Sequence, residues 1–163
     1  IPRGSAILFR SYDTKSRKKV AKELLKFCKI KGLKLLISSD VRMAREINAN
    51  GIHLPEYMIN DQSKINWKNF KAWKTKLKWM VTAAAHNKKT LYKVPEHIID
   101  AVLLSPIFLT KSHPKQIHLG VSKLIKMVHE IKIPIYALGG INLKTVQYLK
   151  KSGITGFAFK RGF

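Results

Sequence analysis

Two adjacent glycines follow the apolar run IYAL, and cations follow the next apolar run along the chain. Gly139 and Gly140 lack a Cβ, so their backbone N–H groups could approach a phosphate without side-chain obstruction. Asn142 is placed to cap a following helix, whose N-terminus adds partial positive charge, and Lys160 and Arg161 come after the next run. This pattern predicts a phosphate site. The alternative is a tight turn that simply requires glycine.

A histidine and a polar loop follow two other apolar runs. His86 comes directly after MVTAAA, and an imidazole with a pKa near 6.5 can transfer protons at neutral pH. A structural histidine in the same loop is the alternative interpretation. The loop LTKSHP carries Thr110, Ser112 and His113, which could close over a substrate or form an exposed loop.

The earlier strand ends supply further polar side chains. Arg10 follows AILF, while Ser38, Ser39 and Asp40 follow KLLI. Donors and cations outnumber carboxylates at these points, so we expect the surface they form to bind an anion.

The elements that must position these residues are short β-branched runs that alternate with helical patterns. We expect strands over seven ranges: Ala6–Phe9, Leu33–Ile37, Gly51–Leu54, Lys78–Ala83, Ala101–Leu104, Ile135–Leu138 and Thr155–Phe159. Helical patterns cover Thr14–Lys31, Val41–Ala49, Val121–Ile131 and Leu143–Lys151, with a poor helical turn over Lys88–Lys93. The tryptophan-rich stretch before Lys78 is expected to be irregular, with its tryptophans packed in the core.

Strands that are apolar on both faces indicate a parallel sheet covered by helices. A doubly wound sheet and a barrel both fit this alternation. The doubly wound fold favours a glycine-rich fingerprint after its first strand, and FRSYD is not one, so the barrel fits better. In such barrels the chemistry lies at the carboxyl ends of the strands.

The composition agrees with one globular domain. The chain has 163 residues, 45% of them hydrophobic, and no apolar run approaches the ~20 residues that span a bilayer. Its single cysteine, Cys28, excludes an internal disulfide and fits buried packing in a reducing cytoplasm. Because the chain does not begin with methionine, we expect residues to precede Ile1 in the complete protein.

A net charge of +23 could attract nucleic acid, anionic lipid or small phosphorylated substrates. Lysine greatly outnumbers arginine, whereas readers of nucleic acid favour the bidentate contacts of arginine. A coding sequence biased towards A and T would also produce this composition. A nucleic-acid role is therefore the less favoured interpretation.

Taken in order, these loops resemble those of the thiamine phosphate synthase and thiazole tautomerase (TenI-like) family. The segments that carry the resemblance are ILFRSYD, KLLISSDVRMAREINANGIHLPE, VTAAAH, LLSPIFLTKSHP and IPIYALGGINLKTVQYLKKSGITGFAF. The resemblance implies a phosphate-binding (β/α)8 TIM barrel that lacks its first βα unit here, with residues 1–163 as a single domain.

The resemblance also implies a chemistry. The synthase joins a hydroxymethylpyrimidine diphosphate to a thiazole phosphate with the help of Mg²⁺, whereas the tautomerase branch uses a histidine as acid and base. By resemblance Arg10 keeps a diphosphate-binding arginine. Ser38 and Ser39 replace an Asn-Asp pair, which leaves Asp40 as a weak metal candidate, and Met58 stands where a second metal-binding Asp is expected.

The positions that bind thiazole phosphate in this family are better retained in the sequence than those that bind the metal and the diphosphate. Thr110 and Ser112 retain a pair of hydroxyls, His113 replaces a lysine, both glycines of ALGGIN are present, and Arg161 replaces a serine. We expect thiamine phosphate synthesis, with a tautomerase-like enzyme or a non-catalytic phosphate binder as alternatives and a basic nucleic-acid binder as a further one. The expected partners are small phosphorylated substrates, without a membrane, and a homo-oligomer is left open.

Overall fold

The computed structural model describes residues 1–11, 16–110 and 117–159. The chain divides into two compact units, Ile1–Val81 and Thr82–Phe163, and strand β4 (Met80–Ala85) crosses the division. In both units helices alternate with strands, and the strand pairs β1–β2, β2–β3, β4–β5, β5–β6 and β6–β7 are parallel, as expected. A single domain over residues 1–163 stays a prediction.

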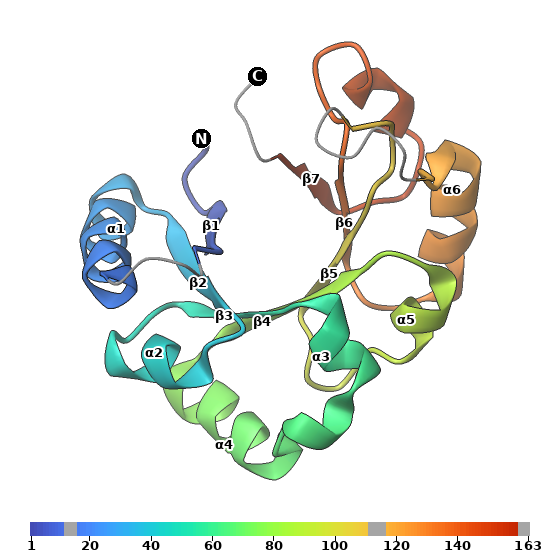
Figure 1. The fold of residues 1–163 in the computed structure, drawn as a ribbon. Coiled ribbons are helices and arrows are strands. Elements are labelled where there is room, and N and C mark those ends of the chain that lie inside the picture. The colour runs from blue at the N-terminus through green and yellow to red at the C-terminus, as the bar shows by residue number, and fades with distance from the viewer. Residues whose placement is uncertain (12–15, 111–116, 160–163) are drawn as a thin grey trace. The chain divides into compact units, whose positions relative to one another are not determined.

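The first unit contains three paired strands with helices outside them (Figure 1). Its elements are β1 (Ala6–Phe9), α1 (Arg17–Lys31), β2 (Lys34–Ser38), α2 (Val41–Glu46), β3 (Gly51–Leu54), α3 (Glu56–Asn60), η1 (Gln62–Lys64) and α4 (Trp67–Leu77). In the register, Phe9 pairs with Ile37, and Ser38 pairs with His53. Helix α1 packs on β2, and α2 packs on β2 and β3.

Helix α1 ends at Lys31, where the sequence predicts, and buries one face. Gly32 adopts the left-handed conformation with φ of +64°, and its N–H donates to the Lys29 carbonyl at 3.2 Å. The buried positions are Ala21, Leu25 and Cys28, whose spacing of four and three residues forms one helical stripe. Phe27 lies off this stripe and is 47% exposed.

The tryptophan-rich stretch is not irregular, because it forms helix α4. The Asn66 side chain begins this helix by accepting a hydrogen bond from the Asn69 N–H at 3.0 Å. Phe70 is 1% exposed, and its ring contacts the rings of Trp67 and Trp79 edge-on at 5.7 and 6.4 Å. The expected packing of tryptophans in the core is confirmed for Trp79, which is buried, whereas Trp67 and Trp73 are half-buried.

The second unit continues the alternation. Its elements after β4 are α5 (Lys88–Tyr92), β5 (Ala101–Leu104), α6 (Gly120–Glu130), β6 (Ile135–Leu138), η2 (Val146–Leu149) and β7 (Gly156–Ala158). The strands pair in chain order from β4 to β7, with Ala85 opposite Leu104 and Leu104 opposite Ala137. In the part of the chain that the structure describes, no helix has the length and apolar character needed to cross a bilayer.

Candidate functional site

His86 follows β4 and is held by the residue that follows β5. Its Nδ1 lies 2.9 Å from the carbonyl oxygen of Ser105 and 3.1 Å from the Ser105 hydroxyl oxygen. A carbonyl oxygen only accepts, so Nδ1 must carry the ring proton, and Nε2 then carries the lone pair. Ser105 is buried, whereas His86 is exposed. This arrangement fixes the tautomer in which Nε2 can accept a proton.

The glycine turn after β6 packs tightly against the loop after β5. Gly139 and Gly140 have φ of +95° and +67°, which side-chain-bearing residues rarely adopt. A Cβ on Gly139 would lie 2.8 Å from Pro106 Cα, and one on Gly140 would lie 2.5 Å from the Leu109 carbonyl oxygen. The Phe108 N–H donates to the Gly139 carbonyl at 3.0 Å. Backbone conformation and close packing therefore both require glycine here, independently of any ligand.

The segment after this turn differs from the prediction. Asn142 does not cap a helix: its Oδ1 accepts from the Lys144 N–H at 2.9 Å within a local turn, and Thr145 precedes η2 without a side-chain cap. The Gly140 carbonyl accepts from the Thr145 hydroxyl at 2.9 Å. The expected helix over Leu143–Lys151 is instead the four-residue 3-10 helix η2, since these short side-chain bonds compete with helical hydrogen bonds. A helix dipole is thus a minor contribution at this turn.

Asp40, the weak metal candidate of the first unit, is engaged by protein donors. One carboxylate oxygen, Oδ1, caps α2 by accepting from the Met43 N–H at 2.8 Å. The other, Oδ2, pairs with Nη1 of Arg17 at 2.9 Å. The same guanidinium donates from Nη2 to the Ser38 carbonyl at 3.0 Å. Sequence reasoning missed Arg17, because nothing distinguishes it from its cationic neighbours in the run SRKK.

The oxygens at this strand end do not fit Mg²⁺. The Ser38 carbonyl, besides the contact with Arg17, accepts from the Ser39 hydroxyl at 2.7 Å and the Asp40 N–H at 2.9 Å. Magnesium requires about six oxygens in octahedral geometry, usually including one or two carboxylates. Met58, in α3, offers no oxygen from its side chain. No cluster of three or more His, Cys, Asp or Glu side chains suited to a metal occurs among residues 1–11, 16–110 and 117–159.

The remaining predicted site residues are only partly described. Arg10 is exposed directly after β1, and Thr110 is half-buried in the loop after β5. Four predicted site residues lie outside the described residues: Ser112, His113, Lys160 and Arg161. The structure thus brings together His86, Ser105 and the glycine turn through contacts between neighbouring loops of the second unit.

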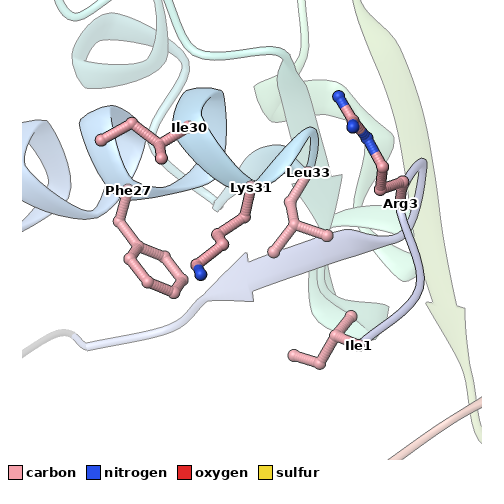
Figure 2. Close-up of a pocket in the computed structure, with 6 residues that line it drawn as sticks. All are labelled: Ile1, Arg3, Phe27, Ile30, Lys31 and Leu33. Atoms are coloured by element: carbon pink, nitrogen blue, oxygen red, sulfur yellow. The ribbon is translucent and has the colours of Figure 1, made fainter.

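A hollow of about 460 Å³ lies at the amino ends of β1 and β2 (Figure 2). It is lined by residues that precede β1 and by the end of α1: Ile1, Arg3, Phe27, Ile30, Lys31 and Leu33. Barrel enzymes place their chemistry at the carboxyl ends of the strands, and this hollow lies at the amino ends. It is therefore not the candidate active site.

Comparison with known proteins identifies the family. A family model described as "Thiamine monophosphate synthase" matches residues 3–163. A protein of Aquifex aeolicus named "Putative thiamine-phosphate synthase 2" is 31% identical over 156 residues, which cover 93% of this chain and 78% of that protein. The thiamine-phosphate synthase of Fusobacterium nucleatum is 27% identical over 149 residues, which cover 90% of this chain and 68% of the relative.

A solved structure shows the same fold. The thiamine phosphate pyrophosphorylase of Pyrococcus furiosus matches with a TM-score of 0.70 at 18% identity, over 95% of this chain and 72% of that protein. The predicted fold class, a TIM-barrel-like α/β fold, is confirmed by this match and by the parallel strands in chain order. The match to the family model across residues 3–163 shows that the chain belongs to the thiamine monophosphate synthase family.

Proposed function

We propose that this protein acts in thiamine biosynthesis as a transferase of the thiamine phosphate synthase type. The observation that carries this proposal is the match of the family model to residues 3–163. In the reaction, the C–O bond of hydroxymethylpyrimidine diphosphate breaks and its electron pair leaves with diphosphate. The ring nitrogen of the thiazole phosphate donates its lone pair to the resulting cation, giving thiamine phosphate. Positioning and charge stabilisation supply most of such catalysis.

The second unit offers groups for the thiazole phosphate. Within the described residues, the N–H groups of Gly139 and Gly140 donate no hydrogen bond to another backbone group, so a phosphate could accept from them. Lys160 and Arg161 follow β7 and would add positive charge. His86 would face the bound substrate through Nε2, since Nδ1 is engaged by the Ser105 carbonyl.

A thiazole tautomerase-like reaction is the second candidate. Two observations favour it over synthesis: the tautomer of His86 is fixed with its lone pair on Nε2, and Asp40 is paired with Arg17 instead of being available to a metal. Proton transfer on a thiazole phosphate would use the lone pair on Nε2 of His86 and would not require Mg²⁺. A cytoplasmic location and a homo-oligomer stay predictions.

One experiment separates these functions. The purified protein is given both substrates, with Mg²⁺ or with EDTA, and thiamine phosphate is measured by chromatography; in parallel, isomerisation of the thiazole phosphate is followed by NMR. Formation of thiamine phosphate establishes the synthase, and isomerisation alone establishes the tautomerase. If neither product appears under any condition, the proposed function is wrong.

His86→Gln tests the role of the imidazole in whichever reaction is found. We expect kcat to fall about 100-fold or more, the usual contribution of a positioned acid or base. His97→Gln is the matched control, because His97 is also exposed but precedes β5 at the other end of the strands. Equal activity of the two variants would exclude His86 from the chemistry.

A further inference from the structure

We propose that Arg17 takes the place of a divalent metal at the carboxyl end of β2, so that the first unit holds its anionic ligand with arginine alone. Only the identity of that ligand, a diphosphate, rests on the proposed function. The exclusion of the metal rests on the contacts of Arg17, Ser38 and Asp40.

The Arg17 guanidinium lies at the carboxyl end of β2, against the carbonyl of Ser38. Arg17 is the first residue of α1, so its backbone is near the end of the helix at which the chain arrives from β1. Its side chain is 17% exposed and that of Asp40 is 33% exposed, so the pair is shielded from solvent on most sides. The guanidinium also lies 6.0 Å from the centre of the Phe9 ring. The planar guanidinium of Arg17 donates to both Asp40 and the Ser38 carbonyl, so one cation holds two oxygens in place.

The oxygens that a metal would need at this strand end already accept hydrogen bonds from protein donors. Both carboxylate oxygens of Asp40 are used, one by the Met43 N–H and one by Arg17. The Ser38 carbonyl accepts from Arg17, the Ser39 hydroxyl and the Asp40 N–H. A Mg²⁺ ion here would have to displace the guanidinium and break the cap of α2, which a single carboxylate does not compensate.

The net charge at this strand end differs from that of a metal site. The Arg17–Asp40 pair is neutral, whereas Mg²⁺ with one carboxylate would leave a charge of +1. Arg10 is then the cation left to hold an anion at this strand end, because β1 pairs with β2 and Phe9 lies opposite Ile37. The residues that follow these two, Arg10 and Ser38, therefore leave adjacent strands at the same edge of the sheet. Arg10 is exposed there and can bind a phosphate bidentately.

The test measures metal and anion separately on the full chain. Binding of Mn²⁺, as a spectroscopic substitute for Mg²⁺, is measured by electron paramagnetic resonance for the wild type, Arg17→Met and the double variant Arg17→Met/Asp40→Asn. Arg42→Met is the control, since Arg42 forms a comparable 2.9 Å ion pair with Glu46 but is 91% exposed on α2. Binding of inorganic pyrophosphate is measured by calorimetry in EDTA and then with added Mg²⁺.

We expect the wild type and Arg42→Met to bind no Mn²⁺ and to bind pyrophosphate equally well in EDTA. Arg17→Met should gain a weak Mn²⁺ site that the double variant loses. If Arg17→Met does not fold, Arg17→Lys replaces it: one ammonium cannot bridge both oxygens as a fork does, so a weaker gain is expected. A wild-type Kd for Mn²⁺ below about 0.1 mM, a free energy of roughly −5.5 kcal/mol, would overturn the proposal.

The anion arm has its own outcomes. Pyrophosphate binding by the wild type that requires Mg²⁺ would also overturn the proposal. If the wild type binds no pyrophosphate under any condition, the diphosphate substrate of the proposed function is wrong. A gain of Mn²⁺ by Arg17→Met would in that case still support exclusion of the metal by Arg17.

Discussion

Gly51, the first residue of β3, allows the backbones of β3 and β4 to approach closely, and its replacement by alanine should be strongly destabilising. A Cβ at this position would lie 1.9 Å from the Met80 carbonyl oxygen and 2.8 Å from Cδ2 of Leu36. The first of these atoms is backbone and cannot rotate away. The Met80 N–H also donates to the Asn50 carbonyl at 3.0 Å, so any movement that relieves the clash strains this hydrogen bond.

The expected cost follows from these two contacts. Overpacking of a well-packed site costs about 1–3 kcal/mol, and a strained backbone hydrogen bond adds roughly 1 kcal/mol. The free energy of unfolding should therefore fall by about 2–4 kcal/mol for Gly51→Ala. For a chain of this size that corresponds to a decrease in Tm of about 4–16 °C.

Urea and thermal unfolding followed by circular dichroism measure this loss. Gly156→Ala, in β7, is the control: the new Cβ would meet only the ring of Tyr136, at 2.8 Å, which is a side chain able to shift. It should cost about 1 kcal/mol, at the low end of overpacking. If Gly51→Ala is no less stable than Gly156→Ala, the close approach of backbone at Gly51 does not determine the choice of glycine.

Two further predictions concern Cys28 and Asp40. Burial raises the pKa of the Cys28 thiol, and the residue is 0% exposed. A thiol reagent at pH 8 should therefore react slowly with the native protein and rapidly with the protein unfolded in urea. Rapid reaction of the native protein would contradict this burial. Asp40→Ala removes the cap of α2 and leaves Arg17 without its carboxylate, which should cost about 2–4 kcal/mol in urea unfolding. Asp40→Asn retains an oxygen for the Met43 N–H and should cost less, and equal losses would show that the cap contributes little.

The strands were the most predictable part of the fold. The bounds of β3, β5 and β6 agree with the prediction, because each is a short, mostly apolar run that is bounded by polar or turn residues. Helix α4 was missed although its signal was present. Trp67, Phe70, Trp73 and Leu77 recur at intervals of three, three and four residues, the spacing of one helical face.

The sequence allowed individual site residues to be placed at strand ends, but it did not predict the contacts between them. His86 could be placed after a strand from the sequence, whereas its contact with Ser105 depends on the register that pairs Ala85 with Leu104. His86 and Ser105 follow this pair, so their proximity can be deduced only when the register is known. The ion pair of Arg17 with Asp40 depends similarly on where α1 begins relative to β2, which local sequence patterns do not determine.

The glycine turn shows why a motif alone does not identify a ligand. Gly139 and Gly140 have positive φ, and added Cβ atoms would meet backbone, so both glycines are explained by packing before any phosphate is considered. Replacing either one would disturb the loop after β5 and would reduce phosphate binding whether or not the amides contact phosphate. Replacing a cation that the sequence assigns to the phosphate site separates the explanations better, because both glycines then stay in place. Arg161→Ala, with phosphate-ester binding measured at low and high salt, is therefore more informative than any glycine variant. Binding unchanged by Arg161→Ala would exclude Arg161 from the site, and wild-type binding that vanishes at high salt would leave packing as the explanation of the motif.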